Sequence, residues 1–234
     1  MGDVWSGPDW RIECGDCLEL LKALPSGSVD AVVTDPPYGI AYKSNMKGRL
    51  QRSVANDQTT EARNAVLAAF PDIPVLCFGS WKMPRPPKTR MVLVWDKGGA
   101  LGMGALDLPW KPDHEEIYVL GKGWEGARDC GSVIRCPPVQ STAMRGRVHP
   151  TEKPVTLMAE LLRKLPQRCT VLDPFMGSGS TGVACLATGR NFIGFEMDRK
   201  YCELGARRLA DVAPLFRSRV ERNQGAELFA REEG

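Results

Sequence analysis

The chain contains no apolar run that approaches the roughly 18 to 20 residues of a membrane span. Its start, Met1 to Trp5, has neither a basic stretch nor an apolar core, so no signal peptide is expected. The formal net charge of +3 neither requires nor excludes a nucleic-acid partner. We therefore expect a cytoplasmic protein with no membrane partner. Its 234 residues fit one domain, 1–234, which can bury a core without disulfide bonds.

Eight cysteines are present, but they lack a second close pair of metal ligands. Cys14 and Cys17 have C-x-x-C spacing, whereas the gap between Cys130 and Cys136 is too loose for zinc. The other four lie in apolar segments, where a free thiol behaves as a small hydrophobic side chain; they are Cys77, Cys169, Cys185 and Cys202. We expect reduced thiols and no metal.

Short apolar runs alternate with amphipathic segments along most of the chain. Strands are expected at residues 10–13, 29–34, 75–78, 91–95, 116–120, 170–172 and 192–195. Helices are expected at residues 17–24, 60–70, 155–165, 181–188 and 199–209. Residues 121–148 show little regular pattern, and the tail from Pro214 predicts a frayed end or a marginal helix. This alternation predicts an α/β fold with a mostly parallel, doubly wound sheet.

The tetrapeptide Asp35-Pro36-Pro37-Tyr38 follows the apolar run of residues 29–34. The two prolines cannot donate backbone hydrogen bonds, so the chain leaves the sheet in a stiff loop. A carboxylate and an aromatic ring are then held at the carboxyl end of a strand, where open α/β sheets place their ligands. This arrangement suits an amino group on a planar ring. The alternative is a proline-rich turn with a solvated Asp35 and a packing Tyr38.

A second motif spans residues 171–182 and reads as a strand, a glycine turn and the start of a helix. Gly177, Gly179 and Gly182 match G-x-G-x-x-G, and Glu196 ends the next predicted strand. The glycines let the backbone approach a nucleotide-like ligand, and the acid can accept both ribose hydroxyls. This geometry fits either a dinucleotide or S-adenosylmethionine, and a simple turn is the further alternative.

Residues 35–38 resemble the catalytic motif (motif IV) of DNA methyltransferases that modify exocyclic amino groups, and residues 173–181 resemble their cofactor motif (motif I). Residues 195–198 resemble motif II, residues 149–154 motif X and residues 15–17 motif III. The catalytic motif precedes the cofactor loop, which is the permuted order of the β class. The resemblance implies a Rossmann-like methyltransferase fold, S-adenosylmethionine as cofactor with S-adenosylhomocysteine as product, double-stranded DNA as substrate, and a homodimer.

The resemblance also implies roles for individual residues. The catalytic residues would be Asp35, Pro36, Pro37 and Tyr38. The cofactor-binding residues would be Asp16, Asp35, Thr151, Lys153, Asp173, Phe175, Gly177, Ser178, Gly179, Thr181 and Glu196. DNA recognition is expected in short variable segments near residues 42–58 and 121–148, with phosphate contacts from Lys43, Lys47, Arg49, Arg52, Arg145 and Arg147.

Several alternatives stay open. Asp16 fits a helix N-cap equally well, Lys153 fits a surface lysine, and basic runs are often solvated surface. Asp35 favours adenine over cytosine by resemblance, and the enzyme would be a site-specific methylase of a restriction–modification system or a phage. The rival functions are a nicotinamide-dependent dehydrogenase, an RNA methylase and a catalytically inactive DNA-binding module. The segment from His114 to Glu116 resembles a family segment that precedes a central strand, and we assign no chemical role to it.

Overall fold

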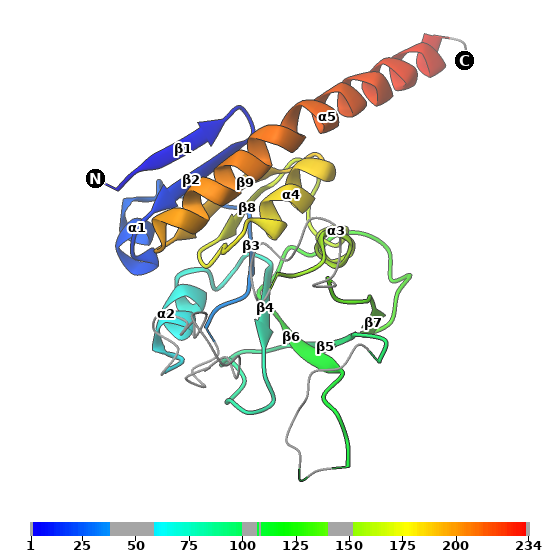
Figure 1. Cartoon of the computed structure of the whole chain (residues 1–234). Coiled ribbons are helices and arrows are strands. Elements are labelled where there is room, and N and C mark those ends of the chain that lie inside the picture. The colour runs from blue at the N-terminus through cyan, green and yellow to red at the C-terminus, as the bar shows by residue number, and fades with distance from the viewer. Residues whose placement is uncertain (1, 38–58, 100–106, 108, 140–151, 233–234) are drawn as a thin grey trace.

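The computed structural model describes residues 2–37, 59–99, 107, 109–139 and 152–232 (Figure 1). The strands are β1 (Val4–Gly7), β2 (Trp10–Cys14), β3 (Ala31–Thr34), β4 (Val75–Gly79), β5 (Met91–Asp96), β6 (His114–Leu120), β7 (Val133–Arg135), β8 (Thr170–Asp173) and β9 (Asn191–Glu196). The helices are α1 (Cys17–Ala23), α2 (Glu61–Ala69), α3 (Val155–Leu162), α4 (Ser180–Ala187) and α5 (Arg199–Glu232). In these described ranges no helix is long and apolar enough to cross a membrane.

The strands form one sheet in the order β1-β2-β9-β8-β3-β4-β6-β5-β7. The strands from β2 to β4 in this order are parallel. β6 runs antiparallel to both β4 and β5, β7 pairs in parallel with β5, and β1 pairs antiparallel with β2. The prediction of an α/β fold with a mostly parallel sheet is confirmed.

Helices cover both faces of the sheet. Because side chains alternate along a strand, neighbouring residues of the central strands enter different cores. Val33 belongs to the core that contains Leu161 of α3, Ala184 of α4 and residues of α5. The preceding residue, Val32, belongs to the second core, with Val66 of α2 and side chains of α1. A strand buried on both faces reads as a continuous apolar run, which is why β3 could be recognised in the sequence.

The structure differs from the sequence expectation at β1, β7 and α5. β1 and β7 have four and three residues, too few for a period-2 pattern to be recognised. α5 runs as one helix from Arg199 through Pro214 to Glu232, where the sequence predicted a helix over 199–209 and a frayed end or a marginal helix from Pro214. Before the proline, Cys202, Ala206 and Leu209 pack into the core at helical spacing. Beyond it, residues with high helix propensity continue the helix past the missing backbone donor.

Asp173 joins two central strands and the helix that follows. Its Oδ1 accepts hydrogen bonds from Thr34 Oγ1 at 2.8 Å and from the Phe175 backbone N–H at 3.2 Å. Its Oδ2 accepts one from Thr181 Oγ1 at 2.6 Å. The side chain is 3% exposed, and this burial outweighs the hydrogen bonds and raises the pKa of Asp173 to about 6.

The pKa of Asp173 predicts a pH dependence of stability. Because the folded pKa lies above the unfolded value, protonation favours the folded state, and this contribution is lost as the pH rises from about 4 to 6. Asp173→Asn removes the titration. Across this pH range we therefore expect the free energy of unfolding of the wild type to fall by about 2 kcal/mol more than that of the variant. Urea unfolding at the two pH values measures this difference. Equal changes in both proteins would contradict the assignment.

Candidate active site

Acidic residues follow or end four strands at one edge of the sheet. Asp35 follows β3, Asp173 ends β8, Glu196 ends β9, and Asp16 lies two residues beyond β2. Because β2, β9, β8 and β3 are parallel neighbours, their carboxyl ends form one continuous edge. The winding reverses between β3 and β8, since the chain adds β4 beyond β3 but β9 beyond β8. Open α/β sheets bind ligands at such a reversal.

Asp35 belongs to a row of four alternating charges. Lys153 Nζ donates a hydrogen bond to Asp35 Oδ2 at 2.5 Å and lies 3.3 Å from Glu115 Oε2. Lys97 Nζ donates to Glu115 Oε1 at 2.7 Å. The four residues lie in the turn after β3, the segment before α3, strand β6 and the turn after β5. The structure thus brings together Asp35 and Lys153, two residues that the sequence placed in one site.

Aromatic rings enclose the Lys153 ammonium. It lies 4.9 Å from the centre of the Phe78 ring and 6.0 Å from that of Trp95, and the residue is 8% exposed. Burial acts to lower the pKa of Lys153, but the carboxylates of Asp35 and Glu115 outweigh it and the pKa is raised. Burial acts to raise the pKa of Glu115, and the ammonium groups of Lys153 and Lys97 lower it overall. Lys153 and Glu115 therefore remain charged at neutral pH.

The glycine loop between β8 and α4 contacts the side chain of Glu196. Gly177 and Gly179 have φ angles of +51° and +80°, which residues with side chains rarely adopt. The Gly177 N–H donates to Glu196 Oε2 at 3.0 Å, and the Asp198 N–H donates to Oε1 at 2.9 Å. Burial raises the pKa of Glu196 despite these hydrogen bonds. Gly182 serves packing, because a Cβ there would lie 2.8 Å from the Phe192 ring.

Asp16 caps α1, since its Oδ1 accepts hydrogen bonds from the backbone N–H groups of Leu18 and Glu19 at 2.8 and 3.3 Å. The same turn lies against the end of β9, because the Gly15 N–H donates to the Glu196 carbonyl at 2.9 Å. The N-cap alternative for Asp16 is therefore confirmed. Its predicted contact with the cofactor stays a prediction, and the two roles are compatible.

Arg208 of α5 connects the glycine loop with the segment before α3. Its guanidinium donates to the Ser178 carbonyl at 3.2 Å and forms an ion pair with Glu152 at 2.7 Å. The hydroxyl groups of Ser178 and Ser180 each lie 3.4 Å from the same nitrogen of Arg208. The side chain of Glu152 is 7% exposed, so this is a largely buried tether.

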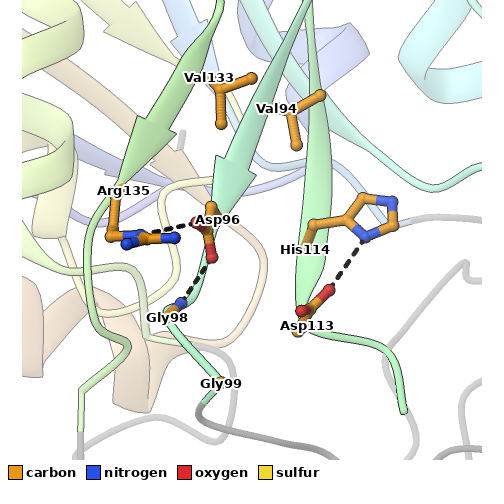
Figure 2. Close-up of a pocket in the computed structure, with 8 residues that line it drawn as sticks. All are labelled: Val94, Asp96, Gly98, Gly99, Asp113, His114, Val133 and Arg135. Atoms are coloured by element: carbon orange, nitrogen blue, oxygen red, sulfur yellow. Dashed lines mark hydrogen bonds and ion pairs between the residues drawn. The ribbon is translucent and has the colours of Figure 1, made fainter. Parts of the chain in front are cut away.

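A cavity of about 550 Å³ lies where β5 and β7 end and β6 begins, and none of the four residues in the row of charges lines it (Figure 2). Arg135 Nε pairs with Asp96 Oδ2 at 2.8 Å, and His114 Nδ1 lies 3.4 Å from Asp113 Oδ1. Gly98 and Gly99 also line it. Among the described residues, no group of three or more His, Cys, Asp or Glu side chains is arranged to hold a metal ion.

Some of the predicted site residues lie outside the described residues. They are Tyr38, Thr151 and the DNA-contact candidates Lys43, Lys47, Arg49, Arg52, Arg145 and Arg147. The sequence reasoning missed Lys97, Glu115 and Arg208. Glu115 lies at the start of β6, and only the antiparallel pairing of β6 with β4 brings that start to the carboxyl edge. The segment from His114 to Glu116 resembles a family segment, but no local pattern in it indicates its partner.

Comparisons with known proteins identify relatives of the chain. A family model described as DNA methylase, of the N6/N4 methyltransferase type, matches residues 109–207. The putative methylase YubD of Escherichia coli (strain K12) is 33% identical over 214 residues, which cover 85% of this chain and 89% of YubD.

Two solved structures share the fold. The PvuII DNA methyltransferase (cytosine-N4-specific) superimposes with a TM-score of 0.66 at 16% identity, covering 90% of this chain and 93% of that one. The M1.HpyAVI–SAM complex gives a TM-score of 0.62 at 23% identity, covering 86% of this chain and all of that one. The identity to YubD and the length that it covers show the family. The chain belongs to the N6/N4 DNA methylase family.

Proposed function

We propose that the chain is a site-specific DNA methyltransferase of the β class that methylates the exocyclic amino group of adenine in a flipped-out base. The observation that carries this proposal is the pairing of β3 with β8, in which Val32 lies opposite Leu172. Asp35 and the glycine loop follow these two strands at the same edge. The Asp35 carboxylate, which would accept hydrogen bonds from the amino group, thus lies next to a glycine loop that is suited to binding a nucleoside.

The residues at this edge fit S-adenosylmethionine. Gly177 and Gly179 have positive φ angles, and because glycine carries no side chain, the loop backbone there can lie close to a ligand. We propose that Glu196 accepts the ribose hydroxyls, that Asp16 lies near the adenine, and that Phe175, Ser178 and Thr181 complete the loop. Asp173 would act mainly by holding that loop, since three hydrogen bonds already engage its oxygens. Thr151 is proposed from the resemblance alone.

The chemistry begins with an amino group whose lone pair is delocalised into the base. When bound, S-adenosylmethionine supplies a methyl group activated by its sulfonium. Asp35 and the carbonyl of Pro36 would accept hydrogen bonds from the amino group and draw its nitrogen toward tetrahedral geometry. The lone pair then forms the new N–C bond as the C–S bond breaks, and the nitrogen releases one proton to Asp35 or to water. Most of the acceleration would come from positioning and electrostatics.

The target base must leave the duplex before it can reach Asp35. We propose that Tyr38 stacks on the flipped base and that Pro36 and Pro37 keep the loop rigid. DNA phosphates would be held by the basic residues of segments 42–58 and 121–148. Within the second of these segments we single out Arg135, which is exposed and lines the cavity at the same strand edge as Asp35.

N4 methylation of cytosine is the second candidate, because a solved structure with the same fold is described as cytosine-N4-specific. Asp35 is the feature that favours adenine. A dehydrogenase is disfavoured by the Pro-Phe-Met sequence at 174–176, which separates the first glycine from strand β8. Calorimetry with S-adenosylmethionine and NAD distinguishes these enzymes.

We also propose a single domain over residues 1–234, which the continuous sheet from β1 to β9 supports. The proposed homodimer rests on the resemblance alone. Light scattering tests it, since a monomer has a mass of 25.7 kDa.

Asp35→Ala tests the central role of the carboxylate. We expect methyl transfer to DNA to fall by about 100- to 1000-fold, because the amino group loses an acceptor in the transition state. Transfer of labelled methyl groups measures the rate, and calorimetry should show that S-adenosylmethionine still binds. Asp72→Ala is the matched control, since Asp72 forms an exposed ion pair with Lys122. Near-normal transfer by Asp35→Ala would overturn the mechanism.

Arg135→Ala tests the proposed DNA surface. If Arg135 contacts a phosphate, its loss should weaken duplex binding and reduce the slope of log Kd against log salt by about 1. Fluorescence anisotropy over a series of salt concentrations measures this slope. Arg90→Ala is the control, because Arg90 is also exposed but precedes β5 at the opposite edge of the sheet. An unchanged slope for Arg135→Ala would remove it from the interface.

A further inference from the structure

We propose that Lys153 is a positioning residue for Asp35, and that Glu115 and Lys97 in turn hold Lys153. The inference rests on the proposed methyl transfer. It differs from the role that the resemblance gives Lys153, which is a contact with the cofactor. The observation behind it is the contact of the Lys153 ammonium with Asp35 Oδ2 at 2.5 Å.

The contact is built from segments that are distant in sequence. Asp35 and Lys153 are 118 residues apart. Glu115 enters from β6, and Lys97 enters from the turn after β5. Each carboxylate lies between or beside ammonium groups, so the row Lys97–Glu115–Lys153–Asp35 alternates in sign. Neighbouring charges of opposite sign fix one another in place more strongly than a single exposed ion pair would.

The surroundings of Lys153 favour this role. Phe78 and Trp95 present their rings to the ammonium and limit its access to water. Trp95 is itself fixed, because its indole N–H donates to the Cys136 carbonyl at 2.7 Å and its ring meets Phe78 edge-on. Burying a charge such as the Lys153 ammonium has a desolvation penalty, and removing one partner of a buried ion pair leaves the charge of the other uncompensated. The ammonium is therefore held to its carboxylates rather than to solvent.

The neighbouring residue points to a different part of the site. Glu152 pairs with Arg208, which holds the Ser178 carbonyl of the glycine loop. Consecutive side chains before α3 thus engage the two halves of the site separately, Glu152 on the cofactor side and Lys153 on the catalytic side. Lys153 therefore sets the direction of the Asp35 carboxylate that the base amino group must meet.

Lys153→Met tests the proposal, because it keeps a long side chain and removes the charge. We expect kcat to fall by about 100-fold, since a misdirected Asp35 loses its alignment with the amino group. The dissociation constant of S-adenosylmethionine should change by less than about twofold, because binding and alignment are separate contributions. The acid limb of the kcat–pH profile should move to higher pH, because the carboxylate loses its neighbouring cation.

Three further variants complete the design. Lys153→Arg keeps a cation beside Asp35 and should recover part of kcat and return the acid limb toward wild type. Lys122→Met is the control, because Lys122 forms an exposed ion pair with Asp72. Glu115→Gln keeps the shape of its side chain and should lower kcat by about tenfold, since Lys153 loses one of its fixing partners.

The outcomes separate the two proposals. If wild type transfers no methyl group, or if Asp35→Ala remains active, the proposed function fails. If the wild type is active and Asp35→Ala is not, the proposed function stands and Lys153→Met tests the inference. A folded Lys153→Met variant that has a normal kcat overturns the inference. A variant that loses only cofactor affinity overturns it as well. Thermal melting monitors folding. If Lys153→Met does not fold, Glu115→Gln decides, and a wild-type kcat in that variant also overturns the inference.

Discussion

The backbone hydrogen bonds between β3 and β8 place the two halves of the site beside each other. Ala31 lies opposite Val171 in this parallel pair, and Thr34 reaches across to the carboxylate of Asp173. A register shift of one residue would turn each side chain of a strand to the other face of the sheet. The position of Asp35 beside the glycine loop therefore depends on the register of β3 against β8. Burial of both faces of the sheet and the hydrogen bond between Thr34 and Asp173 together specify that register.

The site concentrates charge at a place where burial makes charge unfavourable. Asp173 and Lys153 are both almost inaccessible to water, and replacing a buried ion pair with apolar residues often costs no stability. The two buried groups are compensated in different ways. Hydroxyl and backbone donors satisfy Asp173, whereas Lys153 is balanced by the carboxylates of Asp35 and Glu115. The first arrangement holds a loop in place, and the second can direct a carboxylate toward a substrate.

The central strands and the glycine loop could be predicted because their information is local. An apolar run ended by prolines marks β3, and Gly177 and Gly179 mark a turn that needs positive φ angles. The partners of Asp35 could not be predicted in this way. Glu115 reaches the carboxyl edge because β6 runs antiparallel to β4, and no pattern within residues 114–120 reveals that direction. The three-residue strand β7 is likewise defined by its partner β5 rather than by its own sequence.

The most direct measurement is mass spectrometry of nucleosides from DNA that has been incubated with the protein and S-adenosylmethionine carrying a deuterated methyl group. The account predicts that the label appears on an exocyclic amino nitrogen, as N6-methyldeoxyadenosine. Label on N4 of deoxycytidine would keep the mechanism and correct the base. An absence of labelled nucleoside, or label on a ring carbon, would contradict the account of Asp35 as the acceptor for an amino group.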